Sequence, residues 1–188
     1  MKTEYLSSEE LNKMNFGKIG NNVLIDQYVN ITQPENIFIE NNVRIDSFTN
    51  LISSGKLQIS NNVHISSFCH IVSYGGIFMD DFSGLSQGVK VYSITDDYIG
   101  NEPTNPTIPV KFKTIYHKKI IIGKYVIVGS NSIIMPGATL QEGSSVGALS
   151  FVNKKLDPWY VYEGKPIRKI CKRKKTMIKK YKEYLKDN

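Results

Sequence analysis

The sequence has little cysteine and few histidines. Cys69 and Cys171 are the two cysteines among 188 residues, and they form no CxxC pair. This spacing disfavours both a disulfide framework and a cysteine-based zinc site. The three histidines, His64, His70 and His117, show no pattern typical of a three-histidine zinc centre, so we expect no bound metal.

Long apolar runs are also missing. No stretch reaches the roughly 18 apolar residues that a membrane-spanning helix needs, so no span is expected. Residues 1–15 include acidic side chains and no apolar core, which is not the pattern of a signal peptide. Together with the scarce cysteine, these features favour the reducing cytoplasm. The length and the 40% hydrophobic content fit one domain with a sizeable core.

Positive charge is confined to one end of the chain. Residues 165–188 contain eleven Lys or Arg and two acidic residues, a net charge of +9 that leaves −2 of the total +7 for the rest. Such a tail suits phosphates or an anionic surface, or it is simply a solvated helix face. No nucleic-acid motif accompanies it, so we expect no nucleic-acid partner.

Aliphatic residues recur at every sixth position, in series that begin at residues 19, 39, 59, 79 and 122. The series are Ile19, Ile25, Ile31 and Ile37; Ile39, Ile45, Leu51 and Leu57; Ile59, Ile65, Ile71 and Ile77; Met79, Leu85 and Val91; and Ile122, Val128, Ile134, Leu140, Val146 and Val152. A period of six fits neither a helix nor a simple strand. It predicts short strands and turns, three to a coil, whose successive coils pair as parallel strands. The restarts every twenty residues predict a two-residue bulge at one corner of each early coil.

Small or β-branched residues stand four positions after the aliphatic ones. Cys69 occupies this place, so we interpret it as a small core residue. Asparagine pairs, such as Asn41-Asn42, lie between the two positions, where tight corners favour a residue that tolerates a left-handed backbone. The sequence therefore predicts an all-β solenoid.

Three segments depart from the repeat. Residues 7–15 predict a short N-terminal helix capped by Ser7 or Ser8. Residues 92–121 form a long, proline-containing loop, a length that is usually functional. Residues 172–186 have apolar side chains at helical spacing, and we expect this helix to pack on the assembled protein rather than on a membrane. We divide the chain into a helical segment (1–18), a solenoid (19–170) and a basic C-terminal helix (171–188).

This spacing resembles that of the hexapeptide-repeat acyltransferases, over residues 19 to about 170. The resemblance implies a left-handed parallel β-helix and a homotrimer with its sites between subunits. Three stretches resemble the sugar acetyltransferase branch, which includes maltose and galactoside O-acetyltransferases. They are residues 122–130 (IGKYVIVGS), 134–140 (IMPGATL) and 164–168 (GKPIR).

Acetyl-CoA is the co-substrate that this resemblance implies. Its expected contacts fall on Gly129, Ser130, Ala148, Asn153, Lys154, Lys165 and Arg168. Ser130 and Ala148 lie one coil apart and would bind the pantetheine arm through backbone groups. The basic residues would neutralise the phosphates. Alternatively, the two small residues only fill corners.

The catalytic residue is where this sequence departs from the O-acetyltransferases. Their histidine at the start of the long loop corresponds here to Asp96. A carboxylate of ordinary pKa is a poor base unless burial or the adjacent Asp97 raises that pKa. We therefore keep Asp97 and His70 as alternatives, and we also keep the interpretation that the two aspartates simply build a turn.

Acetyl transfer to an amine needs a weaker base than transfer to a hydroxyl group, because a neutral amine attacks a thioester without first losing a proton. Residues 93–98 (SITDDY) and 104–109 (TNPTIP) resemble enzymes that N-acetylate dTDP-linked 3-amino-3,6-dideoxyhexoses. This favours N-acetylation for surface polysaccharide (lipopolysaccharide) biosynthesis. O-acetylation of a galactoside, a maltose-like sugar or a polysaccharide stays the alternative, and a non-catalytic scaffold is a distant one. The expected sugar or nucleotide contacts are Asn50, His70, Tyr74, Lys90 and Tyr98.

Overall fold

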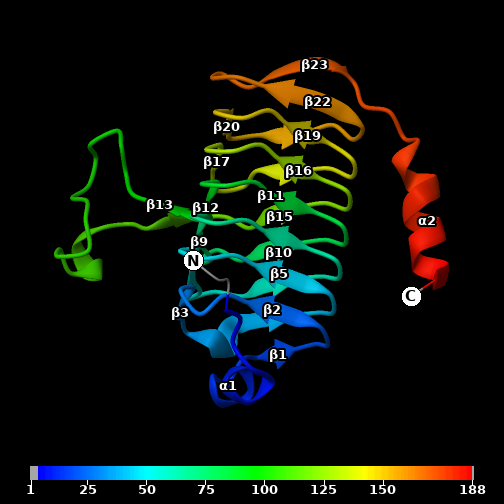
Figure 1. The fold of residues 1–188 in the computed structure, drawn as a ribbon. Helices are drawn as coiled ribbons and strands as arrows, with labels where there is room; N and C mark the ends of the chain where they lie inside the picture. The colour runs from blue at the N-terminus through cyan, green and yellow to red at the C-terminus, as the bar shows by residue number, and fades with distance from the viewer. Residues whose placement is uncertain (1–3, 188) are drawn as a thin grey trace.

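The computed structural model describes residues 4–187 and is a parallel β-solenoid in which short strands stack coil upon coil into three sheets (Figure 1). Sheet 1 contains β1 (Lys18–Ile19), β4 (Ile37–Ile39), β7 (Leu57–Ile59), β10 (Ile77–Met79), β15 (Ile120–Ile122), β18 (Thr139–Leu140) and β21 (Lys155–Leu156). Sheet 2 contains β2 (Val23–Ile25), β5 (Val43–Ile45), β8 (His64–Ile65), β11 (Gly84–Leu85), β16 (Ile127–Val128), β19 (Ser145–Val146), β22 (Tyr160–Glu163) and β23 (Arg168–Lys172). Sheet 3 contains β3 (Asn30–Thr32), β6 (Asn50–Ile52), β9 (His70–Val72), β12 (Lys90–Tyr92), β17 (Ile133–Ile134) and β20 (Phe151–Val152).

The register confirms the predicted coil lengths. Leu57 pairs with Ile77, twenty residues on, and Ile121 pairs with Thr139, eighteen residues on. The predicted corner bulge is wrong, however. The two extra residues lengthen the strands of sheet 1, where Leu57 and Ile59 both point inward and are fully buried. Residues two apart on a strand share a face, so the insertion adds a second inward side chain and leaves the corner unchanged.

The six-residue series lines one continuous apolar core. Ile25, Ile45, Ile65, Leu85 and Val128 are all buried, and each belongs to a different coil of sheet 2. The corner asparagines adopt the expected left-handed backbone, with φ of 53°, 58° and 57° at Asn22, Asn42 and Asn62. The interior therefore follows from the repeat, and the outer surfaces of the sheets are free to carry function.

Helix α1 (Ser8–Lys13) lies at the N-terminal end of the solenoid (Figure 1). Ser7 is its N-cap and forms a capping box with Glu10, and Leu11 is buried. The predicted N-terminal helix is confirmed, and α1 is shorter at both ends than the predicted range 7–15. Met14 caps its last turn and Asn15 has φ 58°, a conformation that ends a helix.

The C-terminal region differs more from expectation. Strand β23 pairs antiparallel with β22 and continues to Lys172, so α2 (Met177–Asp187) begins five residues later than predicted. Helical spacing along the chain does not reveal that the preceding strand, β22, will pair with the residues that lead into the segment. Arg173 ties the connection to the solenoid by donating to the Tyr125 carbonyl at 2.7 Å.

Helix α2 packs on the solenoid of its own chain. Tyr181 stacks on Tyr125 with ring centroids 5.0 Å apart, and it contacts Phe82 at 4.6 Å. Phe82 and Tyr125 continue the corner column that Asn22, Asn42 and Asn62 begin lower down. In the described part of the chain, no helix is long and apolar enough to cross a membrane.

The long loop leaves the solenoid after β12 and returns at β15. Its base is a two-stranded antiparallel hairpin of β13 (Ile94–Thr95) and β14 (Tyr116–His117). Beyond the hairpin the loop projects away from the solenoid and includes a short 3-10 turn, Val110–Phe112; a second such turn, Pro34–Asn36, precedes β4 (Figure 1). The hairpin therefore fixes where the loop starts, directly beside sheet 3.

Candidate functional site

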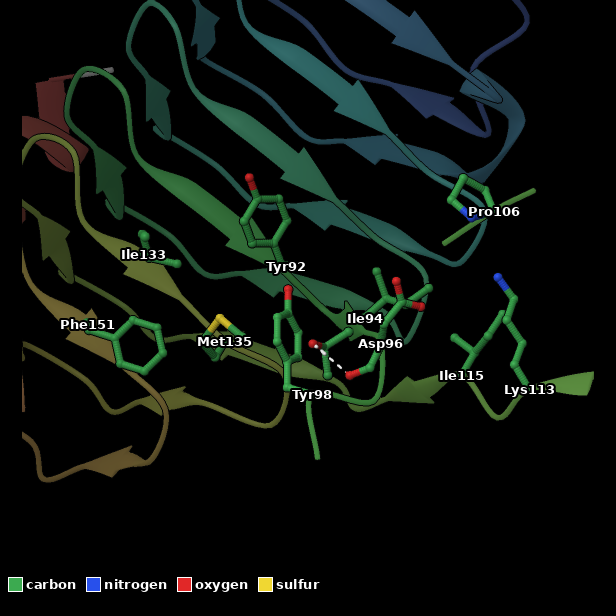
Figure 2. A pocket seen from close by; sticks show the side chains of 11 residues that line it. Tyr92, Ile94, Asp96, Tyr98, Pro106, Lys113, Ile115, Ile133, Met135 and Phe151 are labelled. Atoms are coloured by element: carbon green, nitrogen blue, oxygen red, sulfur yellow. Dashed lines mark hydrogen bonds between the residues drawn. The ribbon is translucent and has the colours of Figure 1, made fainter. Parts of the chain in front are cut away.

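A cleft of about 830 Å³ lies between the loop and the outer surface of sheet 3 (Figure 2). We call it the loop cleft. It is lined by Tyr92, Ile94, Thr95, Asp96, Tyr98, Pro106, Lys113, Ile115, Ile133, Met135 and Phe151. The wall is mostly aromatic and aliphatic, and few polar groups converge in it, which is the usual make-up of a small-molecule site.

Asp96 is half-buried and provides the carboxylate of the loop cleft. It follows β13 directly, so the hairpin pairing positions it. The Asn105 backbone N–H approaches its Oδ2 at 3.4 Å, a long contact that satisfies the carboxylate poorly. Figure 2 shows Asp96 between the two sides of the cleft, close to Tyr98. The carboxylate is therefore placed to accept a hydrogen bond from a ligand.

Asp97 has a different environment from its neighbour. Its side chain is buried and accepts backbone N–H groups from Ile99 at 2.8 Å, Asn101 at 2.7 Å and Glu102 at 3.0 Å. These hydrogen bonds lower the pKa of Asp97, so it is a poorer proton acceptor than an ordinary carboxylate. Asp97 therefore builds the first turn of the loop, and no raised pKa marks it as the alternative base.

Three of the expected sugar or nucleotide contacts form one row on sheet 3. Asn50 pairs with His70 and His70 with Lys90, and the row continues through Ile133 to Phe151 in the wall of the loop cleft. Lys90 donates to the Gly88 carbonyl at 3.1 Å. The row thus leads along the outer surface towards the loop cleft, although its lower members do not line it.

His70 reaches the loop cleft only through a neighbour. Its ring meets Tyr92 edge-on, with centroids 5.7 Å apart, and Tyr92 lines the cleft. Burial, and then the nearby Lys90 charge, lower the pKa of His70. The imidazole is therefore favoured in its neutral form, which can accept a proton, but Asp96 stands nearer to any ligand in the cleft.

The two tyrosines among the expected sugar or nucleotide contacts, Tyr74 and Tyr98, lie in different cavities. Tyr98 lines the loop cleft and is 90% exposed. Tyr74 lies round the corner towards sheet 1, where its ring contacts His117 at 5.3 Å and lines a different, smaller cavity with Lys56 and Lys119. The loop cleft therefore brings together Tyr98 and Tyr92, and Tyr74 lies outside it.

The expected acetyl-CoA contacts fall into two groups. Ser130 and Ala148 lie one coil apart at the corner between sheets 2 and 3. Glycine is required at position 129, because a Cβ there would come within 2.5 Å of the Ala148 nitrogen on the next coil. Asn153 lies at the opposite edge of sheet 3, in a cavity with Phe151, His117 and Lys118. Within one chain, these two groups do not share a cavity.

The basic members of the set lie at the upper end of the solenoid. Lys154, Lys165 and Arg168 are all exposed. The Phe151 N–H donates to the Gly164 carbonyl at 3.1 Å, which brings the turn carrying Lys165 next to the top of sheet 3. The three charged side chains therefore face solvent at the upper end of the solenoid.

Several cleft residues carry no recognisable signal in the sequence. Ile133 and Phe151 occupy outward positions between inward-pointing core residues, and Met135 follows the inward-pointing Ile134. Lys113 comes from the far side of the loop and donates to the Asn105 carbonyl. The period of six marks inward positions only, so it does not distinguish the outward ones. Among residues 4–187, no cluster of three or more potential metal ligands occurs.

Comparison with known proteins identifies the family. No family model matches the chain. It is 34% identical to the dTDP-4-amino-4,6-dideoxy-D-glucose acyltransferase of Escherichia coli, over 93% of this chain and 91% of the relative. The chain belongs to this acyltransferase family. It is therefore an acyltransferase, as the repeat and the stretches around residues 122–140 and 164–168 predicted.

Solved structures agree with this assignment. The N-acyltransferase AntD of Bacillus cereus superposes with a TM-score of 0.95 at 41% identity, over 100% of both chains, in a complex with dTDP-4-amino-4,6-dideoxyglucose and coenzyme A. Another AntD structure holds dTDP and 3-hydroxybutyryl-CoA, with 99% and 98% of the chains covered, 41% identity and a TM-score of 0.95. A maltose O-acetyltransferase of Clostridium difficile shares the fold alone, at 24% identity, a TM-score of 0.58 and coverage of 93% and 79%.

Proposed function

We propose that this chain N-acylates the amine of a dTDP-linked 4-amino-4,6-dideoxyhexose, with a CoA thioester as acyl donor. The observation that carries the proposal is Asp96, an under-bonded carboxylate in an aromatic-walled cleft, in a chain of this acyltransferase family. The resemblance seen in the sequence suggested an amine at C3. The relatives named above are enzymes or complexes of the 4-amino sugar, so we place the amine at C4.

The chemistry of an amine suits the groups in the loop cleft. A neutral amine attacks the thioester carbonyl without first losing a proton, so the site does not need a strong base. In the proposed complex, the Asp96 carboxylate accepts a hydrogen bond from the amine and turns its lone pair towards the carbonyl carbon. Tyr92 and Tyr98 offer flat surfaces and hydroxyl groups to the hexose or the base.

The acyl donor lies along the upper coils in this proposal. Gly129, Ser130 and Ala148 present backbone groups to the pantetheine amides, and Asn153 and Lys154 contact the nucleotide end. Lys165 and Arg168 neutralise its phosphates. Acetyl-CoA is the donor that the family resemblance implies. The AntD complex with 3-hydroxybutyryl-CoA makes a longer acyl group the natural second candidate.

Assembly completes the proposal. The two groups of expected CoA contacts lie at opposite edges of sheet 3, so one ligand would meet both only in a groove between copies. We propose a homotrimer with such grooves. Buried Cys69 and exposed Cys171 are both free, which suits the reducing cytoplasm, where the product would supply surface polysaccharide (lipopolysaccharide) synthesis.

The test is CoA-thiol release from acetyl-CoA and 3-hydroxybutyryl-CoA with three acceptors. These are the dTDP-linked 4-amino-4,6-dideoxyglucose, a dTDP-linked 3-amino-3,6-dideoxyhexose and a simple galactoside. We expect turnover with the 4-amino sugar. Preference for the 3-amino sugar would move the amine to C3, and turnover with the galactoside alone would replace N-acylation by O-acetylation. No release with either amino sugar would refute the proposal.

A further inference from the structure

A smaller hollow, of about 310 Å³, lies on the outer surface of sheet 1, beside the base of the long loop. It is lined by Lys56, Gln58, Tyr74, Gly75, Gly76, Ile77, Phe78 and Lys119. We call it the two-lysine hollow. None of these residues lines the loop cleft, and none is an expected CoA contact. The proposed function therefore gives this hollow no role.

The solenoid repeat places two lysines on either side of a glycine. Lys56, Gly76 and Lys119 directly precede β7, β10 and β15, whose first residues pair in register. The two lysines therefore start about 10 Å apart, one coil above and one coil below Gly76. Gly76 has φ 90°, which favours glycine, and a Cβ there would stand 3.7 Å from Cγ of Lys119. The missing side chain leaves a gap between two positive charges.

The two ammonium groups rest on aromatic rings. Nζ of Lys56 lies 4.6 Å from the ring centroid of Phe38, and Nζ of Lys119 lies 5.9 Å from that of Phe78. Among residues 4–187, neither ammonium group forms an ion pair or a hydrogen bond. The described lining contains no carboxylate either. A contact between an exposed cation and a ring is weak, so an anion entering the gap can attract both lysines.

The neutral groups of the hollow suit the rest of a small ligand. Gln58 and Phe78 pair on neighbouring strands and point outward, so the Phe78 ring provides a flat apolar floor. Within the described part of the chain, the Gln58 amide and the Tyr74 hydroxyl have no hydrogen-bond partner, and both can donate. Two cations, two neutral donors and an aromatic floor together match a phosphate dianion that carries a small organic group.

The two-lysine hollow is tied to the hairpin at the base of the long loop. The backbone N–H groups of Tyr74 and Gly75 both donate to Oγ of Ser93, at 2.8 and 2.9 Å. Ser93 directly precedes β13, and its carbonyl accepts the N–H of Lys118, which directly follows β14, at 3.0 Å. The Tyr74 ring also contacts His117 of β14. A ligand in the hollow therefore touches residues that hold the hairpin in place.

We propose that the two-lysine hollow is a second ligand site, which binds the phosphate group of a small phosphate ester. Lys56 and Lys119 neutralise the phosphate above Gly76, and Phe78 packs against the organic part. The bound ligand steadies the hairpin through Tyr74. This site is separate from the acyl-transfer chemistry, so the inference goes beyond the proposed function and does not depend on it. Free phosphate has the same charge and oxygens, and the experiment distinguishes the two sources.

The first experiment measures binding to the full-length protein by isothermal titration calorimetry. The probes are phenyl phosphate, glucose 1-phosphate and inorganic phosphate, each at millimolar concentration. We expect phenyl phosphate to bind more tightly than inorganic phosphate, because its ring packs on Phe78. Equal affinities would support the phosphate site and identify free phosphate as its ligand. No binding of any of the three probes would overturn the proposal.

Charge-removing variants test whether the probe binds in the hollow. Lys56→Met and Lys119→Met keep the apolar stem and lose the charge, so each should raise the Kd for phenyl phosphate at least about tenfold with an unchanged circular dichroism spectrum. Lys155→Met is the matched control, because Lys155 is also exposed on sheet 1 but does not line the hollow. It should keep the wild-type Kd. An equal loss in all three variants, or in none, would overturn the proposal.

Two further measurements test the link to the hairpin and the separation from the donor site. Phenyl phosphate should slow amide hydrogen exchange in β13 and β14 of the wild-type protein, and it should have no such effect on the Lys56→Met/Lys119→Met double variant. The double variant should bind CoA with the wild-type Kd. A loss of CoA affinity would make the hollow part of the donor site and overturn the proposal. Lack of acyl transfer by the wild-type protein would instead refute the proposed function and leave the phosphate binding unaffected.

Discussion

The solenoid wall and the long loop are built by opposite means. In the wall, each buried side chain is repeated by its counterpart one coil away, so Ile45, Ile65 and Leu85 share one environment. In the loop, single side chains hold the backbone, and Asp97 alone accepts three backbone N–H groups. Repetition makes a wall that tolerates variation on its outer face. The loop owes its specific shape to a few irreplaceable contacts.

The largest effect on stability should come from the wall. Ile71 is fully buried, and Ile71→Ala should lower the free energy of unfolding by about 2–5 kcal/mol, through lost burial and a cavity. Ile99 is 88% exposed in the loop, so Ile99→Ala should change the free energy of unfolding by less than about 0.5 kcal/mol. Urea unfolding followed by far-UV circular dichroism measures both. Equal effects would mean that the loop is as much a part of the core as the wall.

The largest effect on turnover should come from the loop. Asp96→Asn should lower turnover at least about tenfold, because the amide no longer accepts the amine hydrogen as an anion would. The oligomer should stay intact by size-exclusion chromatography. Turnover equal to wild type would remove Asp96 from the mechanism and leave His70 as the remaining candidate on sheet 3.

Removing a positive charge from the upper end of the solenoid should weaken the binding of the acyl donor only. Arg168→Ala should raise KM for acyl-CoA severalfold and leave KM for the amino sugar nearly constant, because the lost charge faces phosphates. Steady-state kinetics with each substrate varied in turn separates the two constants. A change confined to the sugar constant would contradict the assignment.

The smallest effect is a pH dependence local to the loop. Because hydrogen bonds lower the folded-state pKa of Asp97, its contribution to loop order is complete above the ordinary pKa, near 4, and is lost as pH falls through the lower folded value. Hydrogen exchange of residues 99–102 should therefore accelerate below about pH 4. In Asp97→Asn, exchange should be fast already at neutral pH. Acceleration spread evenly over the wall would instead indicate global acid unfolding.

Some of the site is readable in the sequence. The coil length alone places Asn50, His70 and Lys90 in one row. Residues 93–98 indicate a functional site at the start of the loop. The outward residues Ile133 and Phe151 are not readable, because a period of six identifies only side chains that point inward. The difference between Asp96 and Asp97 is equally hidden, since it depends on which carboxylate the loop backbone folds around.

The sequence by itself determined the solenoid, its coil lengths and the residues of its core, because a strict repeat leaves one way to bury an aliphatic side chain every six positions. The tertiary structure decided the rest. It paired β23 with β22 and seated α2 on Phe82 and Tyr125 of its own chain. It also joined His64 to Asp46 of the neighbouring coil. These contacts link residues without a common period, and only the folded backbone brings them together.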